Sequence, residues 1–356
     1  MRRKIVRPKF SRVAQVTLTL VALAPLLAGL AGCQREAEVP AEWPQLPGYE
    51  VMAIPADNPM TPAKVALGKQ LFYDARLSGD GSRSCYSCHV KEHGLTDGRA
   101  TAIGAYEKPL PRSSPTLWNI GYHSQFYWDG RSGSMEAQVK GAWRGGNMGA
   151  SGTDGHPSME EICAQLNEIV GYRQQFQDVF GADATPDNVA QAIASFERTI
   201  VANDSAWARF QQGDEAAFSE AARRGWQLFS GKTNCTNCHD GRLLTDLQYH
   251  NVGIGMKDAE PDLGRYKVTE EDKDRGAFKT PTLLDISKSA PYFHNGSVAT
   301  LEEAVEMMLG GGLDNEHLDR TNLKPVTLTE EEKADLLAFL RALEVDYTVT
   351  EPALPE

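Results

Sequence analysis

The sequence is poor in cysteine, in positive charge and in long apolar runs. Lys and Arg number 36 against 48 Asp and Glu, so the formal net charge is −12. This balance argues against a nucleic-acid partner and favours a protein partner that is neutral or presents basic residues. After residue 30 no run approaches the roughly 18 apolar residues of a membrane helix, and few stretches alternate as strands do. A mainly α-helical protein is therefore expected.

The N-terminus has the three parts of a secretory signal. Six Lys and Arg lie within residues 2–12, an apolar run extends from Val13 to Leu30, and Leu30-Ala-Gly-Cys33 closes it. That ending looks like a lipoprotein cleavage box, so residues 1–33 are predicted to be a signal with Cys33 as the lipidated residue. An ordinary cleaved signal or an uncleaved anchor is the alternative. Loss of residues 1–32 removes six of the 36 basic residues and no acidic one, which leaves a charge of −18. The expected location is the periplasm, with a lipid anchor as the only membrane attachment.

Two short motifs use four of the six cysteines: Cys85-Tyr-Ser-Cys88-His89 and Cys235-Thr-Asn-Cys238-His239. In C-x-x-C-H the two thiols attach a c-type haem and the His binds its iron. A zinc site or a redox dithiol is the alternative. Two copies, each followed by His in a chain with an export signal, favour two covalent haems c. The sixth cysteine, Cys163, is predicted to be a small buried residue in a helix.

The chain divides into a lead and two halves. Residues 34–60 are rich in Pro and Glu and are predicted to form a tether and an extended lead-in. Residues 61–205 are assigned to a first haem domain and 206–348 to a second, as the length suggests. Helices are predicted from Thr61-Pro62, over 158–178 with a capping box, from Thr185-Pro186, over 219–229 and over 329–343. The last is expected to pack back on the first domain. The stretch up to Val139 shows little periodicity and is expected to wrap irregularly around a porphyrin.

An internal duplication relates the halves. Gly68–Phe72 matches Gly225–Phe229, and after the motifs a constant offset of 166 places Pro115–Leu117 on Pro281–Leu283. Two cytochrome c-like domains with long irregular loops are therefore predicted. At the same offset Met308 falls on Ala142. A Met opposite His239 would complete a six-coordinate electron-transfer haem, with core packing as the alternative role. Ala142 cannot bind iron, so the haem of His89 is predicted to keep an open face for a small molecule.

Several longer motifs occur in a fixed order along both halves and together point to one family: Leu71–Asp74, Thr96–Arg99, Phe126–Arg131, Asp262–Arg265, Phe278–Leu283, Pro291–Gly296 and Leu301–Val305. With both C-x-x-C-H motifs, they make residues 50–345 resemble the bacterial di-haem cytochrome c peroxidases and their MauG-type relatives. The resemblance implies that hydrogen peroxide is reduced at the His89 haem, with electrons from a small c-type cytochrome or cupredoxin entering through the His239/Met308 haem. It implies that Trp128 carries electrons between the haems, that Gln138 lines the peroxide pocket, and that the protein is a homodimer.

The sequence departs from that family at three places. Activatable peroxidases have a distal His in a Gly-His loop, whereas Gly104 is followed by Ala105 and Tyr106. The first haem is therefore expected to be open without activation, Tyr106 being a lesser candidate ligand. Asn147 stands where the family usually has Glu, and Asn cannot titrate. Gln138 with water, or another carboxylate, would have to move the proton, or turnover would be weak.

The third departure concerns calcium, for which Ser113 replaces the family's Asn. Backbone oxygens near Ser289 and Pro291 remain candidate ligands for one Ca²⁺. His250 and His294 are predicted to be hydrogen-bonding groups near a propionate or the interface. The missing distal His and Asn147 also favour a second hypothesis, a MauG-type oxidase that uses peroxide to oxidise residues of a partner protein.

Overall fold

The computed structural model describes residues 43–348 and 350–356, and this part of the chain is mainly helical. The longer helices of the first half are α1 (Pro62–Tyr73), α2 (Met135–Arg144), α3 (Met159–Glu168), α4 (Val170–Phe180) and α5 (Pro186–Glu197). Those that follow are α6 (Ala206–Phe210), α7 (Glu220–Ser230), α8 (Tyr266–Thr269), α9 (Leu301–Leu309) and α10 (Glu330–Arg341). Two-residue strands β1 (Tyr249–His250) and β2 (Phe278–Lys279) pair antiparallel. The predicted signal, Cys33 and residues 34–42 lie outside the described residues.

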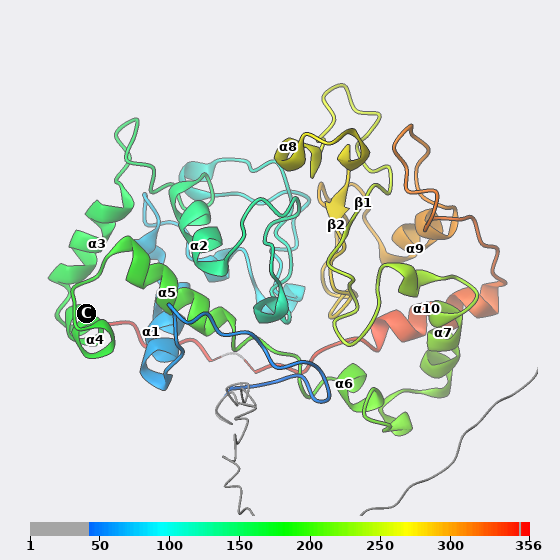
Figure 1. Cartoon of the computed structure of the whole chain (residues 1–356), viewed down its shortest axis with the longest axis horizontal. Helices are drawn as coiled ribbons and strands as arrows, with labels where there is room; N and C mark the ends of the chain where they lie inside the picture. The colour runs from blue at the N-terminus through cyan, green and yellow to red at the C-terminus, as the bar shows by residue number, and fades with distance from the viewer. Residues whose placement is uncertain (1–42, 349) are drawn as a thin grey trace, which may run out of the picture. The chain divides into compact units, whose positions relative to one another are not determined.

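Each half is built on a close crossing of two helices (Figure 1). Helix α1 crosses α5 at Gly68, where a Cβ would lie 1.8 Å from the carbonyl oxygen of Ala192. Helix α7 crosses α10 at Gly225, where a Cβ would lie 2.0 Å from the carbonyl oxygen of Asp335. Only glycine permits this approach. The duplicated Gly-x-x-Leu-Phe sequence therefore has the same packing function twice.

The backbone repeats the duplication beyond the helices. Asn119 and Asp285, 166 residues apart, both have left-handed φ (57° and 55°), and so do Tyr127 and Phe293 (both 69°). Non-glycine residues rarely adopt this conformation. Its recurrence at equivalent positions shows that the loops, and not only the helices, follow one plan in both halves.

One predicted helix needs correction, and one helix was missed. The single helix predicted over 158–178 is two helices, because Ile169 has extended backbone (ψ 109°) between α3 and α4. The capping box of Ser158 and Glu161 is confirmed. Helix α2 was not predicted, although Met135, Val139 and Trp143 recur every four residues and are all buried. Cys163 is 3% exposed on α3, as predicted.

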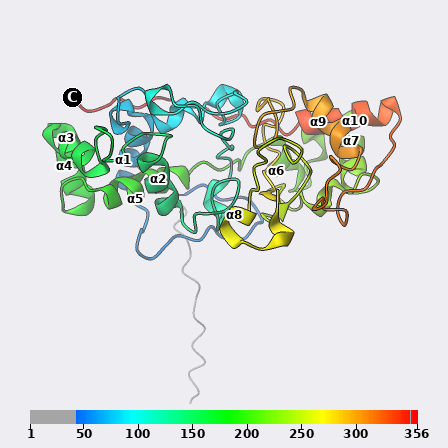
Figure 2. The same cartoon turned by 90° about the horizontal axis from the view of Figure 1, so that it is seen from above.

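The two ends of the described chain also differ from expectation. Helix α10 packs on α7 in its own half, whereas a return to the first half was expected. The segment after α10 makes that return, as Figures 1 and 2 show: Gln70 Nε2 donates to the Ala353 carbonyl (3.2 Å) and Arg76 Nη2 to that of Pro355 (3.0 Å).

The lead-in is packed rather than free. Leu46 and Met52 are 5% and 2% exposed and cluster with Val201 and Leu243. Among the described residues no helix is both long and apolar enough to cross a membrane.

Candidate functional site

The two C-x-x-C-H motifs have the same local structure. Cys85–Ser87 and Cys235–Asn237 each form a 3₁₀ turn. The Nδ1 of His89 lies 3.0 Å from the carbonyl oxygen of Leu95, and that of His239 lies 3.1 Å from the carbonyl oxygen of Leu244. A carbonyl can only accept, so Nδ1 donates and Nε2 is left free to bind a metal. Burial lowers the pKa of His89 to about 4, which keeps the ring neutral, as a ligand must be.

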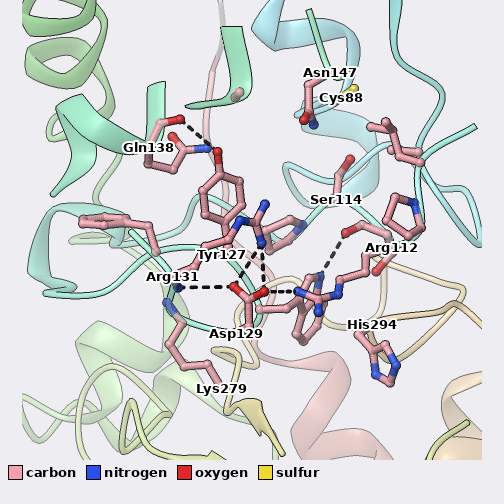
Figure 3. A pocket seen from close by; sticks show the side chains of 18 of the residues that line it. Cys88, Arg112, Ser114, Tyr127, Asp129, Arg131, Gln138, Asn147, Lys279 and His294 are labelled. Carbon is pink, nitrogen blue, oxygen red and sulfur yellow. Dashed lines mark hydrogen bonds and ion pairs between the residues drawn. The ribbon is translucent and has the colours of Figure 1, made fainter. Parts of the chain in front are cut away.

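A cavity of about 920 Å³ opens beside the first motif. Cys85, Cys88 and His89 line it together with Leu77, Leu117, Ile120 and Val139. Its volume is at the upper end of the 300–1,000 Å³ usual for ligand sites. The lining also includes charged side chains, among them Arg112, Asp129, Arg131 and Lys279, which are labelled in Figure 3. Size, lining and the placement of both thiols fit a covalent haem.

Two buried nitrogen groups on this cavity, the His123 ring and the Lys279 ammonium, have no carboxylate as a hydrogen-bond partner. His123 lines the cavity, and its Nε2 is buried without a hydrogen bond. Lys279 Nζ donates to the Gln125 carbonyl (2.6 Å), and burial lowers the pKa of Lys279 to about 8. Buried polar groups normally have partners. Haem propionates would supply them, which supports the fit. No sequence motif distinguishes His123 from a surface histidine; only its burial in the folded chain does.

The remaining predicted residues of the first site lie on the same cavity. Gln138 and Ala142 from α2 and Asn147 after it are part of the lining, and Tyr127 Oη donates to the Gln138 carbonyl (3.0 Å; Figure 3). Tyr106 is not part of it: its side chain is 40% exposed and stacks on His156 at 3.9 Å between ring centroids. The lesser hypothesis that Tyr106 binds the iron therefore has no geometric support.

Two carboxyl groups on the cavity differ in protonation. Asp129 accepts from Arg112 (2.7 Å) and Arg131 (3.0 Å), and Figure 3 shows it between them. Burial alone would raise its pKa, but the two guanidinium groups hold the pKa below its ordinary value. Glu197 on α5 is also on the cavity, and burial raises its pKa to about 8. Glu197, which sequence reasoning missed, is thus suited to exchange a proton near neutral pH, whereas Asp129 stays ionised.

Trp128 lies between the two halves. Its Nε1 donates to the Ser113 carbonyl (2.9 Å), and its own carbonyl accepts from Lys279 N of β2 (2.8 Å). Its ring stands edge-on to His294, 6.5 Å between centroids. Arg112 reinforces the contact with a 2.6 Å ion pair to Asp262.

The second site has its own charged group. His250 lies between Asp246 (Nε2 to Oδ2, 2.9 Å) and Asp319 (Nδ1 to Oδ2, 2.6 Å). Ligand atoms of His250, Asp246 and Cys238 lie within 4.8 Å of one another. Since Cys238 belongs to the haem motif, this grouping is part of that site and not a separate metal centre. Met308 occupies the last turn of α9.

Two of the residues named for calcium have hydroxyl groups, and both hydroxyls form hydrogen bonds within the protein. Ser113 Oγ donates to the Phe293 carbonyl (3.0 Å) and Ser289 Oγ to the Ile286 carbonyl (3.3 Å). The backbone oxygens near Ser289 and Pro291, which were the expected ligands, take no part in these two bonds, so the calcium site stays a prediction.

The fold and these paired motifs define a c-type di-haem protein, and comparison with known proteins places it further. The family model described as "Di-haem cytochrome c peroxidase" matches residues 62–216. The chain is 38% identical to the cytochrome-c peroxidase IdrP1 of Denitromonas iodatirespirans, over 94% of each chain. It is also 38% identical to the methylamine utilization protein MauG of Methylorubrum extorquens, over 85% of this chain and 84% of that one.

Among solved structures, a MauG-like protein associated with microbial copper homeostasis superposes with a TM-score of 0.75. It shares 32% identity, with 87% of this chain and 96% of that one covered. The diheme peroxidase BthA of Burkholderia thailandensis shares the fold (TM-score 0.66, 19% identity, 81% and 87% covered). The chain belongs to the di-haem cytochrome c peroxidase family, whose members carry two haems c, and it is a peroxidase-type oxidoreductase.

Proposed function

We propose that this protein reduces hydrogen peroxide at a haem held by Cys85, Cys88 and His89. The observation that carries the proposal is Ala142, which lines that cavity at the place where the second half has Met308. A bound haem would supply an iron that coordinates peroxide and exchanges electrons with it. Ala142 could not bind that iron, so the part of the cavity beside α2 would stay open to peroxide.

The second half accepts electrons from the external donor and passes them to the first half. Cys235, Cys238, His239 and Met308 would hold its haem in the six-coordinate form suited to electron transfer. Trp128, bonded to Ser113 on one side and to β2 on the other, provides the aromatic step between the halves. The donor is proposed to be a small c-type cytochrome or cupredoxin.

Proton handling rests on the residues around the cavity. Gln138 and Asn147 orient peroxide by hydrogen bonds but cannot titrate. Glu197 supplies the titratable group, since its raised pKa lets it hold and release a proton near neutral pH.

The export signal and the need to attach haem outside the cytoplasm support a periplasmic location, with a lipid on Cys33 as the anchor. A homodimer is proposed from the family resemblance alone. A calcium ion at Ser113, Ser289 and Pro291 is likewise proposed from the family resemblance alone, and no step is assigned to it.

The test is steady-state oxidation of reduced small cytochromes and cupredoxins by hydrogen peroxide with purified holoprotein. The expected result is turnover that needs no prior reduction of the enzyme. If the protein speeds the oxidation of none of these donors, the peroxidase proposal fails.

A second candidate is a MauG-type oxidase acting on residues of a partner protein. Asn147 on the cavity and the absence of His at Ala105 favour it, because both differ from activatable peroxidases. The retained Met308 speaks against it. Peroxide-dependent modification of a co-encoded protein, detected by mass spectrometry without turnover of small cytochromes, would decide for it.

A further inference from the structure

Two tyrosines are stacked beside the first haem motif. Tyr86 lies between Cys85 and Cys88, and its ring stacks on that of Tyr73 at the end of α1, with 4.5 Å between centroids and 27° between planes. Phe72, next to Tyr73, lies 6.4 Å from the His89 ring. Both phenols are partly buried. The two rings are therefore in van der Waals contact, and Tyr86 directly follows Cys85, one of the two cysteines predicted to attach the haem.

The duplication shows that this pair is not required by the fold. In the second half Ser230 follows Phe229, and Thr236 lies between Cys235 and Cys238. Neither side chain is aromatic, although the helix crossing and the histidine hydrogen bond are the same. The tyrosines occur only beside the haem with the open face. A purely structural pair would be expected in both halves.

Further aromatic and acidic groups adjoin the pair. Tyr347, on the segment after α10, is one of the groups that raise the pKa of Tyr73, and it meets Trp118 edge-on at 5.2 Å between centroids. Glu92 adds to the effect of burial in raising the pKa of Tyr86. A phenol that loses an electron becomes strongly acidic, and a nearby carboxylate such as Glu92 can take its proton.

We propose that Tyr86 and Tyr73 form a redox-active site that supplies electrons when peroxide reacts at the first haem and no external donor is present. The inference rests on the proposed peroxidase reaction. Each phenol gives one electron and one proton: its O–H bond breaks and a neutral tyrosyl radical remains. Two electrons and two protons cleave the O–O bond of one peroxide and form two waters. The site thus protects the haem from its own oxidant.

The test uses holoprotein in which tyrosine is ring-deuterated, mixed with peroxide without donor and frozen for EPR. The expected result is a radical signal that narrows on deuteration and is lost in the double variant Tyr73→Phe/Tyr86→Phe. Phe keeps the stacking but has no O–H to oxidise. Tyr106→Phe, an exposed stacked tyrosine of the same half, is the matched control and should keep the signal.

Peptide mass spectrometry gives a second readout, in which oxidation products should concentrate on Tyr73 and Tyr86. A signal unchanged in the double variant, or one that responds to deuterated tryptophan instead, overturns the inference and leaves the peroxidase proposal standing. If the haem absorption does not change on adding peroxide, both proposals fail.

Discussion

Ala142 and Met308 occupy the same position in two copies of one helix. Helix α2 begins after Ser134, whose side chain accepts from Ala137 N, and α9 begins after Thr300, whose side chain accepts from Glu303 N. Counted from these caps, Ala142 and Met308 are equivalent. Ala142 thus brings a methyl group to the first cavity, and the equivalent position of α9 carries a thioether.

Exchanging these two residues should exchange the properties of the haems. Ala142→Met is expected to place a thioether at the open face, convert the first haem to low spin and slow peroxide turnover at least about tenfold. Absorption and steady-state kinetics are the measurements. Met307→Ala, beside Met308, is the control and should change neither haem, whereas Met308→Ala should open the second.

Replacing Trp128 should slow electron transfer between the halves. Trp128→Phe removes the indole and its 2.9 Å bond to Ser113, and stopped-flow transfer from the second haem should fall roughly tenfold, about 1.4 kcal/mol in barrier. Trp118 is a matched control, because it is a buried tryptophan whose Nε1 donates from the first half to the second (to Asp285 Oδ2, 2.9 Å), but it is not on the cavity. An equal loss in Trp118→Phe would show a general effect of loosening the halves.

Glu197→Gln should change the dependence on pH. Its native pKa of about 8 exceeds the ordinary 4.5, so the folded protein holds the proton more tightly than the unfolded chain. The free energy of unfolding therefore falls as pH rises from 4.5 to 8. In the Glu197→Gln variant, the free energy of unfolding is expected to fall less over this pH range. The plot of peroxide turnover rate against pH is expected to lose an ionisation near pH 8. Thermal unfolding and kinetics across this range measure both, and Glu107→Gln, an exposed carboxyl, should alter neither.

His250 should stabilise the second half as a cation. Hydrogen bonds to Asp246 and Asp319 raise its pKa, so its contribution is complete below pH 6.5 and is lost as pH rises through the raised pKa. His250→Gln leaves two carboxylates facing each other and should cost about 2 kcal/mol at pH 7. Chemical denaturation gives the value; an unchanged midpoint would contradict the ion pairs.

The helix crossings should tolerate no side chain. Gly68→Ala and Gly225→Ala each force a Cβ against a backbone carbonyl and should cost about 3 kcal/mol or more. Gly133→Ala, with nothing within 4 Å of the added Cβ, should be neutral. Thermal unfolding of all three variants would show whether the halves share this constraint.

The sequence was most informative where local chemistry sets the structure. Thr61, Ser158, Thr185 and Thr329 cap helices because their side chains satisfy free backbone amides, and each was predicted from its neighbours. The haem motifs could also be predicted because their residues have a fixed spacing. The difference between Ala142 and Met308 could be predicted because the two halves align at a constant offset.

What sequence reasoning missed depends on burial and on long-range packing. Glu197 and His123 matter because the folded chain encloses them, and no local pattern reports that. The return of the final segment to α1 results from contacts between distant residues, as does the packing of Leu46 against Leu243.

EPR of the ferric holoprotein as isolated, followed by addition of peroxide, tests the central claim most directly. The asymmetry of Ala142 and Met308 predicts one high-spin and one low-spin haem at rest, with the high-spin signal alone lost first when peroxide is added. Two low-spin signals at rest, with no change on adding peroxide, would contradict the account, because the first haem would then have a second ligand from the protein.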